Sequence, residues 1–178
     1  MPLHRVAGLV SLLAILALAS PATAGLPAFA DAEIVINKSL AGVKIAGTVS
    51  AAKKAWGKPT YCDPTYCIYR KARQDTSTGE GSFAQRDGTV FNAQLSAPRD
   101  AQGKVTFTPA LAKAKTDKGI GIGSTKKQFL KAYPKAEDMG GGTAYAIKKG
   151  KRVTQFGFDP ATKRMNSILI ADTGLANP

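Results

Sequence analysis

The segment Gly42-Val43-Lys44-Ile45-Ala46-Gly47-Thr48 recurs 77 positions later, without a gap, as Gly119-Ile120-Gly121-Ile122-Gly123-Ser124-Thr125. The residues that follow repeat as well, because Lys54-Ala55-Trp56-Gly57-Lys58 aligns with Lys131-Ala132-Tyr133-Pro134-Lys135 at the same shift. Self-similarity at a fixed spacing indicates that one structural unit occurs more than once in a chain. We therefore predict two tandem units, with chance similarity as the alternative.

Each copy predicts a turn followed by a short amphipathic helix. Thr48 and Thr125 can cap a helix through their hydroxyl groups, and Pro59 and Pro134 stop it. The apolar residues at helical spacing are Val49, Ala52 and Trp56 in the first copy, and Phe129, Leu130 and Tyr133 in the second. The glycines of residues 119–123 lack the full spacing of a nucleotide-binding loop, so we interpret them as turn and close-packing residues.

Segments that favour β-strands follow each helix. The first copy has them at residues 66–70, 81–85 and 89–95, with a hairpin turn at Asp87-Gly88. The second copy has them at residues 143–147, 152–158 and 165–171, and we expect one more strand at residues 104–108. The sequence thus predicts an α+β fold of two tandem units, each a short helical segment packed on an antiparallel sheet of three to four strands.

The expected boundaries follow from the repeat and from the composition of the N-terminus. Residues 1–24 are typical of a secretory signal, with Arg5 before an apolar stretch and small residues before a cleavage site. Cleavage after Ala30 is the alternative. We place repeat unit 1 at residues 31–96, a connecting segment at 97–118 and repeat unit 2 at 119–178. The apolar stretch of about 14 residues is shorter than the roughly 20 that span a bilayer, so we expect a secreted monomer without a transmembrane segment.

The two cysteines, Cys62 and Cys67, flank an Asp-Pro-Thr turn that can bring their sulfur atoms together. In an oxidising compartment a disulfide is the default, and closing so small a loop contributes about 2 kcal/mol. The alternatives are a metal pair or a redox pair. Two thiolates without further Cys or His make a poor metal site, and the spacing does not match C-x-x-C.

The histidine content excludes several kinds of catalysis. The only histidine is His4, which lies in the expected leader. A mature chain without imidazole can form neither a Ser-His-Asp nor a Cys-His nucleophile, nor a zinc site based on histidine. We expect a non-enzymatic protein with no catalytic residue, no cofactor and no metal.

The chain is strongly basic, with 25 Lys+Arg against 12 Asp+Glu and a formal net charge of +13. Such a charge can simply keep the protein soluble, or it can attract a polyanion. The candidate polyanion contacts are the paired cations Lys126, Lys127, Lys148, Lys149, Lys151 and Arg152. Tyrosines 61, 66 and 69 beside Arg70-Lys71 could stack on nucleic-acid bases, but sheet packing explains them at least as well, so we do not expect nucleic acid.

The repeated phrase also carries a resemblance that covers about residues 39–171. Glycines, an Ile or Val, a Thr and then Ala-Trp or Ala-Tyr, given twice behind a signal peptide, resemble the secreted β-lactamase-inhibitor-like fold and the related SmpA/OmlA-type assembly lipoproteins. The opening of the second copy is similar to exported proteins of actinobacterial type. The resemblance implies a non-enzymatic protein that binds other proteins on a concave sheet. Two features depart from it, because cysteines occur only in the first copy and no cysteine is available for acylation.

These observations lead to one expected function and two alternatives. We expect an exported binding or structural module that meets an unknown protein partner on a joined sheet face. The first alternative is a basic envelope-associated protein that binds an anionic cell-wall polymer or lipid. The weaker alternative, which rests on the resemblance alone, is an inhibitor of a secreted β-lactamase.

Overall fold

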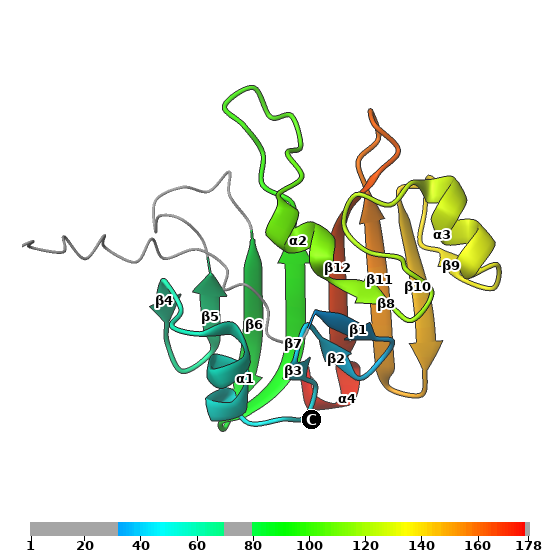
Figure 1. Ribbon diagram of the computed structural model, residues 1–178. Helices are drawn as coiled ribbons and strands as arrows, with labels where there is room; N and C mark the ends of the chain where they lie inside the picture. The colour runs from blue at the N-terminus through cyan, green and yellow to red at the C-terminus, as the bar shows by residue number, and fades with distance from the viewer. Residues whose placement is uncertain (1–31, 70–79, 177–178) are drawn as a thin grey trace, which may run out of the picture.

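The computed structural model describes residues 32–69 and 80–176, and it has an α+β fold dominated by sheet (Figure 1). The expected signal peptide and Arg70-Lys71 lie outside the described residues. The strands are β1 (Glu33–Val35), β2 (Ser39–Leu40), β3 (Val43–Lys44), β4 (Tyr61–Cys62), β5 (Tyr66–Tyr69), β6 (Gly81–Arg86), β7 (Thr89–Ser96), β8 (Lys115–Thr116), β9 (Glu137–Asp138), β10 (Ala144–Lys149), β11 (Arg152–Phe158) and β12 (Met165–Asp172). The helices are α1 (Val49–Trp56), α2 (Pro109–Lys113), α3 (Lys126–Ala132) and α4 (Thr173–Ala176).

Eight of the strands form one sheet in the order β4-β5-β6-β7-β12-β11-β10-β9. Every neighbouring pair in this sheet is antiparallel, and β7 joins β12 in the middle through pairs such as Leu95 with Ile168. The expectation of a separate sheet of three to four strands in each unit is therefore corrected. The last strands of the two meanders pair with each other, because both carry buried side chains on the same side and leave a free edge otherwise.

A second, smaller sheet has the order β3-β2-β1-β8, in which β1 and β8 run parallel. Figure 1 shows this small sheet and the helices α1, α2 and α3 on the same side of the large sheet. The buried side chains of the small sheet, Ile34, Leu40 and Val43, belong to one continuous apolar core with those of the large sheet. We call the side of the large sheet that faces this core the covered face.

Both predicted helices are present, and both begin at the predicted threonines. The Thr48 hydroxyl accepts a hydrogen bond from the Ala51 amide at 3.2 Å. Thr125 forms a capping box in which its hydroxyl accepts from the Gln128 amide and the Gln128 side chain accepts from the Thr125 amide. Each helix ends before the predicted proline, and each turns its apolar side inward, with Trp56 and Phe129 fully buried.

The predicted strands of both copies are confirmed, with the exception of residues 104–108. In that segment only Val105 makes an isolated bridge, to Arg99. The carboxylate of Asp100 accepts hydrogen bonds from the amides of Gln102 and Lys104 at 3.0 and 2.8 Å. This Asp-centred turn uses backbone donors that a strand would need, so the prediction of a strand there is wrong.

The start of each helix is tied to the last hairpin of its own half of the sheet by the same backbone hydrogen bonds. The amide of Ala46 donates to the Val90 carbonyl at 2.8 Å, and 77 positions later the amide of Gly123 donates to the Met165 carbonyl at 2.8 Å. The amide of Val49 donates to Gly88 at 3.0 Å, and 77 positions later that of Lys126 donates to Lys163 at 2.9 Å.

Comparing these positions predicts two stabilising substitutions. Ala46 (φ 64°) and Lys163 (φ 56°) adopt the left-handed conformation that glycine supplies at Gly123 and Gly88. This conformation disfavours residues with a Cβ by roughly 1–2 kcal/mol, and glycine gives back roughly 0.5–1 kcal/mol through its unfolded-state entropy. Ala46→Gly and Lys163→Gly should therefore each raise the free energy of unfolding by about 0.5–1 kcal/mol in urea titrations. Lys127→Gly, in the exposed face of α3, is the control and should lower it by about 1 kcal/mol. A loss of stability in either of the first two variants would contradict the prediction.

Candidate functional site

The opposite side of the large sheet, which we call the second face, is formed by the side chains that alternate with the buried ones. In the part of the chain that the structure describes, no helix or strand other than the four-residue α4 is available to cover it, because α1, α2, α3 and the small sheet lie on the covered face (Figure 1). On the four central strands its residues are Ser82, Ala84, Asn92, Gln94, Ser96, Val153, Gln155, Gly157, Ser167, Leu169 and Ala171. None of them is charged.

The register places an apolar residue at the centre of this face, between two amides. Leu169 on β12 lies opposite Gln94 on β7 and opposite Gln155 on β11. All three side chains are half-buried. The Gln94 amide donates to the hydroxyl of Ser96 at 2.8 Å. The centre of the face therefore offers a leucine and two side-chain amides within one row across the sheet.

The side chains around this centre are small, which makes the face flat. At Gly157 a Cβ atom would overlap the hydroxyl group of Ser167 on the neighbouring strand. Ala146 on β10, in the same row as Gln155, is only 1% exposed. A flat surface without charges can pack against another protein without removing an ion from water, which is the expensive part of burying a polar surface.

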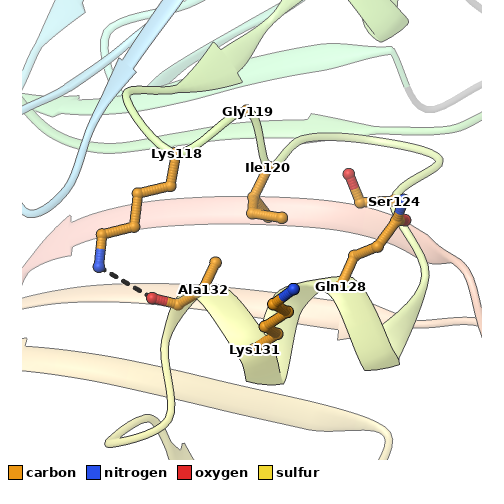
Figure 2. A pocket seen from close by; sticks show the side chains of 7 residues that line it. All are labelled: Lys118, Gly119, Ile120, Ser124, Gln128, Lys131 and Ala132. Atoms are coloured by element: carbon orange, nitrogen blue, oxygen red, sulfur yellow. Dashed lines mark hydrogen bonds between the residues drawn. The ribbon is translucent and has the colours of Figure 1, made fainter.

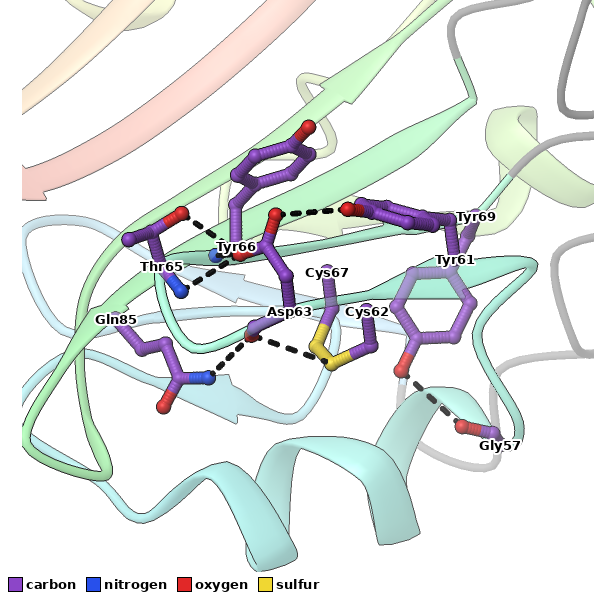
Figure 3. The surroundings of a disulfide bond; sticks show 9 residues. All are labelled: Gly57, Tyr61, Cys62, Asp63, Thr65, Tyr66, Cys67, Tyr69 and Gln85. Carbon is purple, nitrogen blue, oxygen red and sulfur yellow. Dashed lines mark hydrogen bonds between the residues drawn. A yellow bond between two sulfur atoms is a disulfide. The ribbon is translucent and has the colours of Figure 1, made fainter.

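The predicted disulfide between Cys62 and Cys67 is confirmed. It joins the facing residues of β4 and β5 around the turn that Asp63 organises (Figure 3). The Asp63 carboxylate accepts hydrogen bonds from the Thr65 hydroxyl and from the amides of Thr65 and Tyr66. These hydrogen bonds, with that of the Thr65 hydroxyl the largest cause, lower the pKa of Asp63 to about 2.

The tyrosines considered for nucleic-acid stacking do not form one surface. Tyr69 is 1% exposed, its hydroxyl donates to the Gly57 carbonyl at 3.1 Å, and burial raises its pKa to about 12. Tyr66 is 39% exposed and lies 5.6 Å from the ring of Tyr61. Sheet packing therefore accounts for Tyr69.

The structure does not bring the six predicted polyanion contacts together. Lys126 and Lys127 begin α3, beside the start of β10, whereas Lys148, Lys149, Lys151 and Arg152 surround the hairpin at its other end. Three of the six already have a partner. The Lys126 ammonium donates to the Gly142 carbonyl at 2.9 Å, Lys148 pairs with Glu137 at 2.6 Å, and Arg152 pairs with Asp172 at 3.3 Å.

Sequence reasoning placed Lys53 and Lys54 on a solvated helix face and gave Lys58 no role. The structure places all three around one open hollow of about 760 Å³ at the end of α1. The residues of the second face were not identified from the sequence either. The signal that could have found them is the alternation of buried and polar residues in Asn92-Ala93-Gln94-Leu95 and its counterparts.

Two searches within the described residues return nothing. No three His, Cys, Asp or Glu side chains lie close enough to hold a metal ion. No described helix has the length and apolar character that a membrane crossing requires.

Comparison with known proteins gives two solved structures of similar fold. No protein-family model matches the chain, and no curated protein matches it. An extracellular protein containing an SCP domain from Bacillus anthracis str. Ames is 16% identical, with a TM-score of 0.45 over 72% of this chain and 44% of that one. A cysteine-rich secretory protein from Staphylococcus aureus subsp. aureus Mu50 is 12% identical, with a TM-score of 0.44 over 81% and 50%. The chain thus spans about half the length of the structures it matches.

The resemblance to β-lactamase-inhibitor-like and SmpA/OmlA-type proteins is wrong, because the similar structures are these two secretory proteins instead. The physical reason lies in the phrase that carried the resemblance. Thr48 and Thr125 are helix caps, and Gly42 (φ 86°) and Gly119 (φ 73°) are turn residues with positive φ. Such positions require these residue types wherever a turn leads into a helix, so they report local structure and do not specify a family.

Proposed function

We propose that this chain is an exported, non-enzymatic module that binds another protein on the second face of its large sheet. The observation that carries the proposal is the absence of charge on the four central strands of that face. A formal net charge of +13 makes an uncharged stretch across four strands unusual for a surface that meets only water. Protein-binding surfaces are depleted of charged residues at their centre, and the centre here is Leu169 between two amides.

Export is supported by the leader of the sequence and by the disulfide. A bond between Cys62 and Cys67 persists in an oxidising compartment and is rare in the cytosol. We expect a reductant to raise the intact mass by the two hydrogen atoms that opening this bond adds.

The interpretation as two tandem units is supported by the strand order and by the helix starts. Each half of the large sheet is a four-stranded meander preceded by a capped helix, and the two meanders meet at their last strands. The backbone bonds of Ala46 and Val49 recur at Gly123 and Lys126. On this interpretation the second face exists only where both units are present, since β7 belongs to one and β12 to the other.

A charge placed at the centre of the second face should abolish most of the binding. Leu169→Arg puts a guanidinium between Gln94 and Gln155, where a partner would have to bury it unpaired. A central contact residue typically contributes about 2 kcal/mol or more, so we expect affinity to fall about 30-fold or more. The partner is first captured from envelope extracts by cross-linking to the full exported chain, and affinities are then measured with the purified pair.

The matched control is Ala112→Arg, which adds the same side chain at an exposed position of α2, on the opposite side of the large sheet. This variant should bind the partner within about twofold of the wild type, as surface substitutions away from a contact usually do. Equal affinity of Leu169→Arg and wild type for the captured partner would refute binding on the second face.

A further inference from the structure

The end of α1 borders an open hollow of about 760 Å³ that is lined by three lysines, Lys53, Lys54 and Lys58. We call it the α1 hollow. All three lysines are exposed. Pro59 and Tyr61 form part of its wall, and Figure 3 shows Tyr61 next to the disulfide above the helix.

The backbone at this corner brings the third lysine to the other two. Gly57 ends α1 with φ 77°, a left-handed conformation that turns the chain back, so Lys58 reaches the same hollow as Lys53 and Lys54. The Gly57 carbonyl is held by the hydroxyl of the buried Tyr69 at 3.1 Å. The disulfide closes the neighbouring hairpin. The hollow is therefore built on a corner that is fixed before any ligand arrives.

The positive charge of the hollow is not neutralised by the described parts of the chain. Each of the three ion pairs there, Arg99–Asp159, Lys148–Glu137 and Arg152–Asp172, lies elsewhere. No carboxylate lines the hollow. Asp63, which follows its last lining residue, directs its carboxylate to the turn that contains Thr65 and Tyr66. The favourable interaction of Lys53 and Lys54 with the C-terminal end of α1 explains two cations there but not Lys58, which lies beyond the helix.

The second half of the sheet offers an internal comparison. Lys131 and Lys135 align with Lys54 and Lys58, and Lys131 lines a hollow of about 440 Å³ with Lys118 (Figure 2). Here the Lys118 ammonium is already used. It donates to the Ala132 carbonyl at 2.8 Å and lies 4.8 Å from the centre of the Tyr133 ring. The α1 hollow thus differs from its counterpart by having all of its lysines available.

We propose that the α1 hollow binds the phosphate groups of a linear anionic polymer. A lysine ammonium acts on phosphate as a compact point charge, and three of them can neutralise one phosphate together with its neighbour along the chain. The hollow is open, so a polymer can pass through it, whereas an enclosed cavity would suit a small molecule. This site is separate from the second face and replaces the scattered cations that the sequence suggested.

The test measures binding of fluorescently labelled inorganic polyphosphate to the full exported chain at several salt concentrations. The triple variant Lys53→Gln, Lys54→Gln, Lys58→Gln removes the proposed contacts. For a flexible single chain each contact contributes about 0.7 to the slope of log K against log salt, so the slope should fall by about two. At 0.1 M salt the affinity should then fall by roughly 100-fold.

The matched control is the triple variant Lys127→Gln, Lys149→Gln, Lys151→Gln, which removes the same charge at exposed lysines remote from the α1 hollow. It should lose less than about threefold in affinity. An equal loss in both triples would show that net charge alone drives binding and would overturn the proposal, as would failure of the wild type to bind polyphosphate. Unfolding midpoints within about 1 °C of the wild type establish that both triples are folded. Leu169→Arg should retain polyphosphate binding, so this proposal and the proposed function can fail independently.

Discussion

Trp56→Ala should lower the free energy of unfolding by about 3–5 kcal/mol, the usual range for removing a fully buried tryptophan. Trp56 has no exposed surface, and its ring meets the Tyr69 ring edge-on at 5.4 Å and the Phe83 ring at 6.3 Å. Its indole nitrogen donates to the Ala41 carbonyl at 2.9 Å. Alanine leaves both a cavity and a buried carbonyl without its donor, and domains of this size are stable by only about 5–15 kcal/mol.

The same variant tests whether the two halves of the large sheet unfold together. Trp56 lies in the first half, but β7 and β12 pair along five residues between Ser96 and Asn92, so we expect one transition for the whole chain. Urea titrations followed by far-ultraviolet circular dichroism and by the near-ultraviolet signal of the tyrosines should give coincident midpoints. Trp56→Phe keeps the apolar contacts and is the control, with a loss of about half that of Trp56→Ala. Two separate transitions in the variant would contradict a single cooperative sheet.

The features that could be predicted from the sequence are those with a local cause. Thr48 and Thr125 cap their helices through hydroxyl groups three residues from the amide they accept from. Asp87 and Gly88 form the predicted hairpin turn because both adopt positive φ, 50° and 75°. Each signal lies within a few residues of the structure it specifies, so no tertiary information is needed to interpret it.

The features that escaped prediction depend on residues distant in the chain. The pairing of Leu95 with Ile168 joins strands that each look complete as the end of a meander. The small sheet needs β8 beside β1, and its strands of two or three residues are too short to show a periodicity. The candidate sites follow the same rule. The second face exists because the two meanders join, and the α1 hollow exists because Gly57 reverses the chain.

Gly121→Ala should lower the free energy of unfolding by about 3 kcal/mol, the upper part of the range for overfilling a packed site. A Cβ atom at Gly121 would overlap the Ala114 carbonyl oxygen and come within 2.9 Å of the Lys115 side chain. A flexible side chain can move away, but the Ala114 carbonyl leads directly into β8. That strand is held against β1 by the pairs Glu33–Lys115 and Ile34–Thr116. The added methyl group can therefore be accommodated only by separating β8 from β1, which we expect as faster hydrogen exchange of the Lys115 amide, now bonded to the Ala32 carbonyl at 3.0 Å.

Gly119→Ala is the control that separates packing from backbone conformation. Gly119 has φ 73° but open space where a Cβ would lie, so alanine there should lose only about 1–2 kcal/mol and leave β8 protected from exchange. Gly121 has no such φ, so a loss at Gly121 no larger than at Gly119, with slow exchange at Lys115, would remove the close contact. A large loss at Gly121 would give this glycine a structural reason that needs no bound nucleotide. The Gly119-x-Gly121-x-Gly123 pattern would then be a turn, a close contact and a second turn, each required by the way the second unit begins.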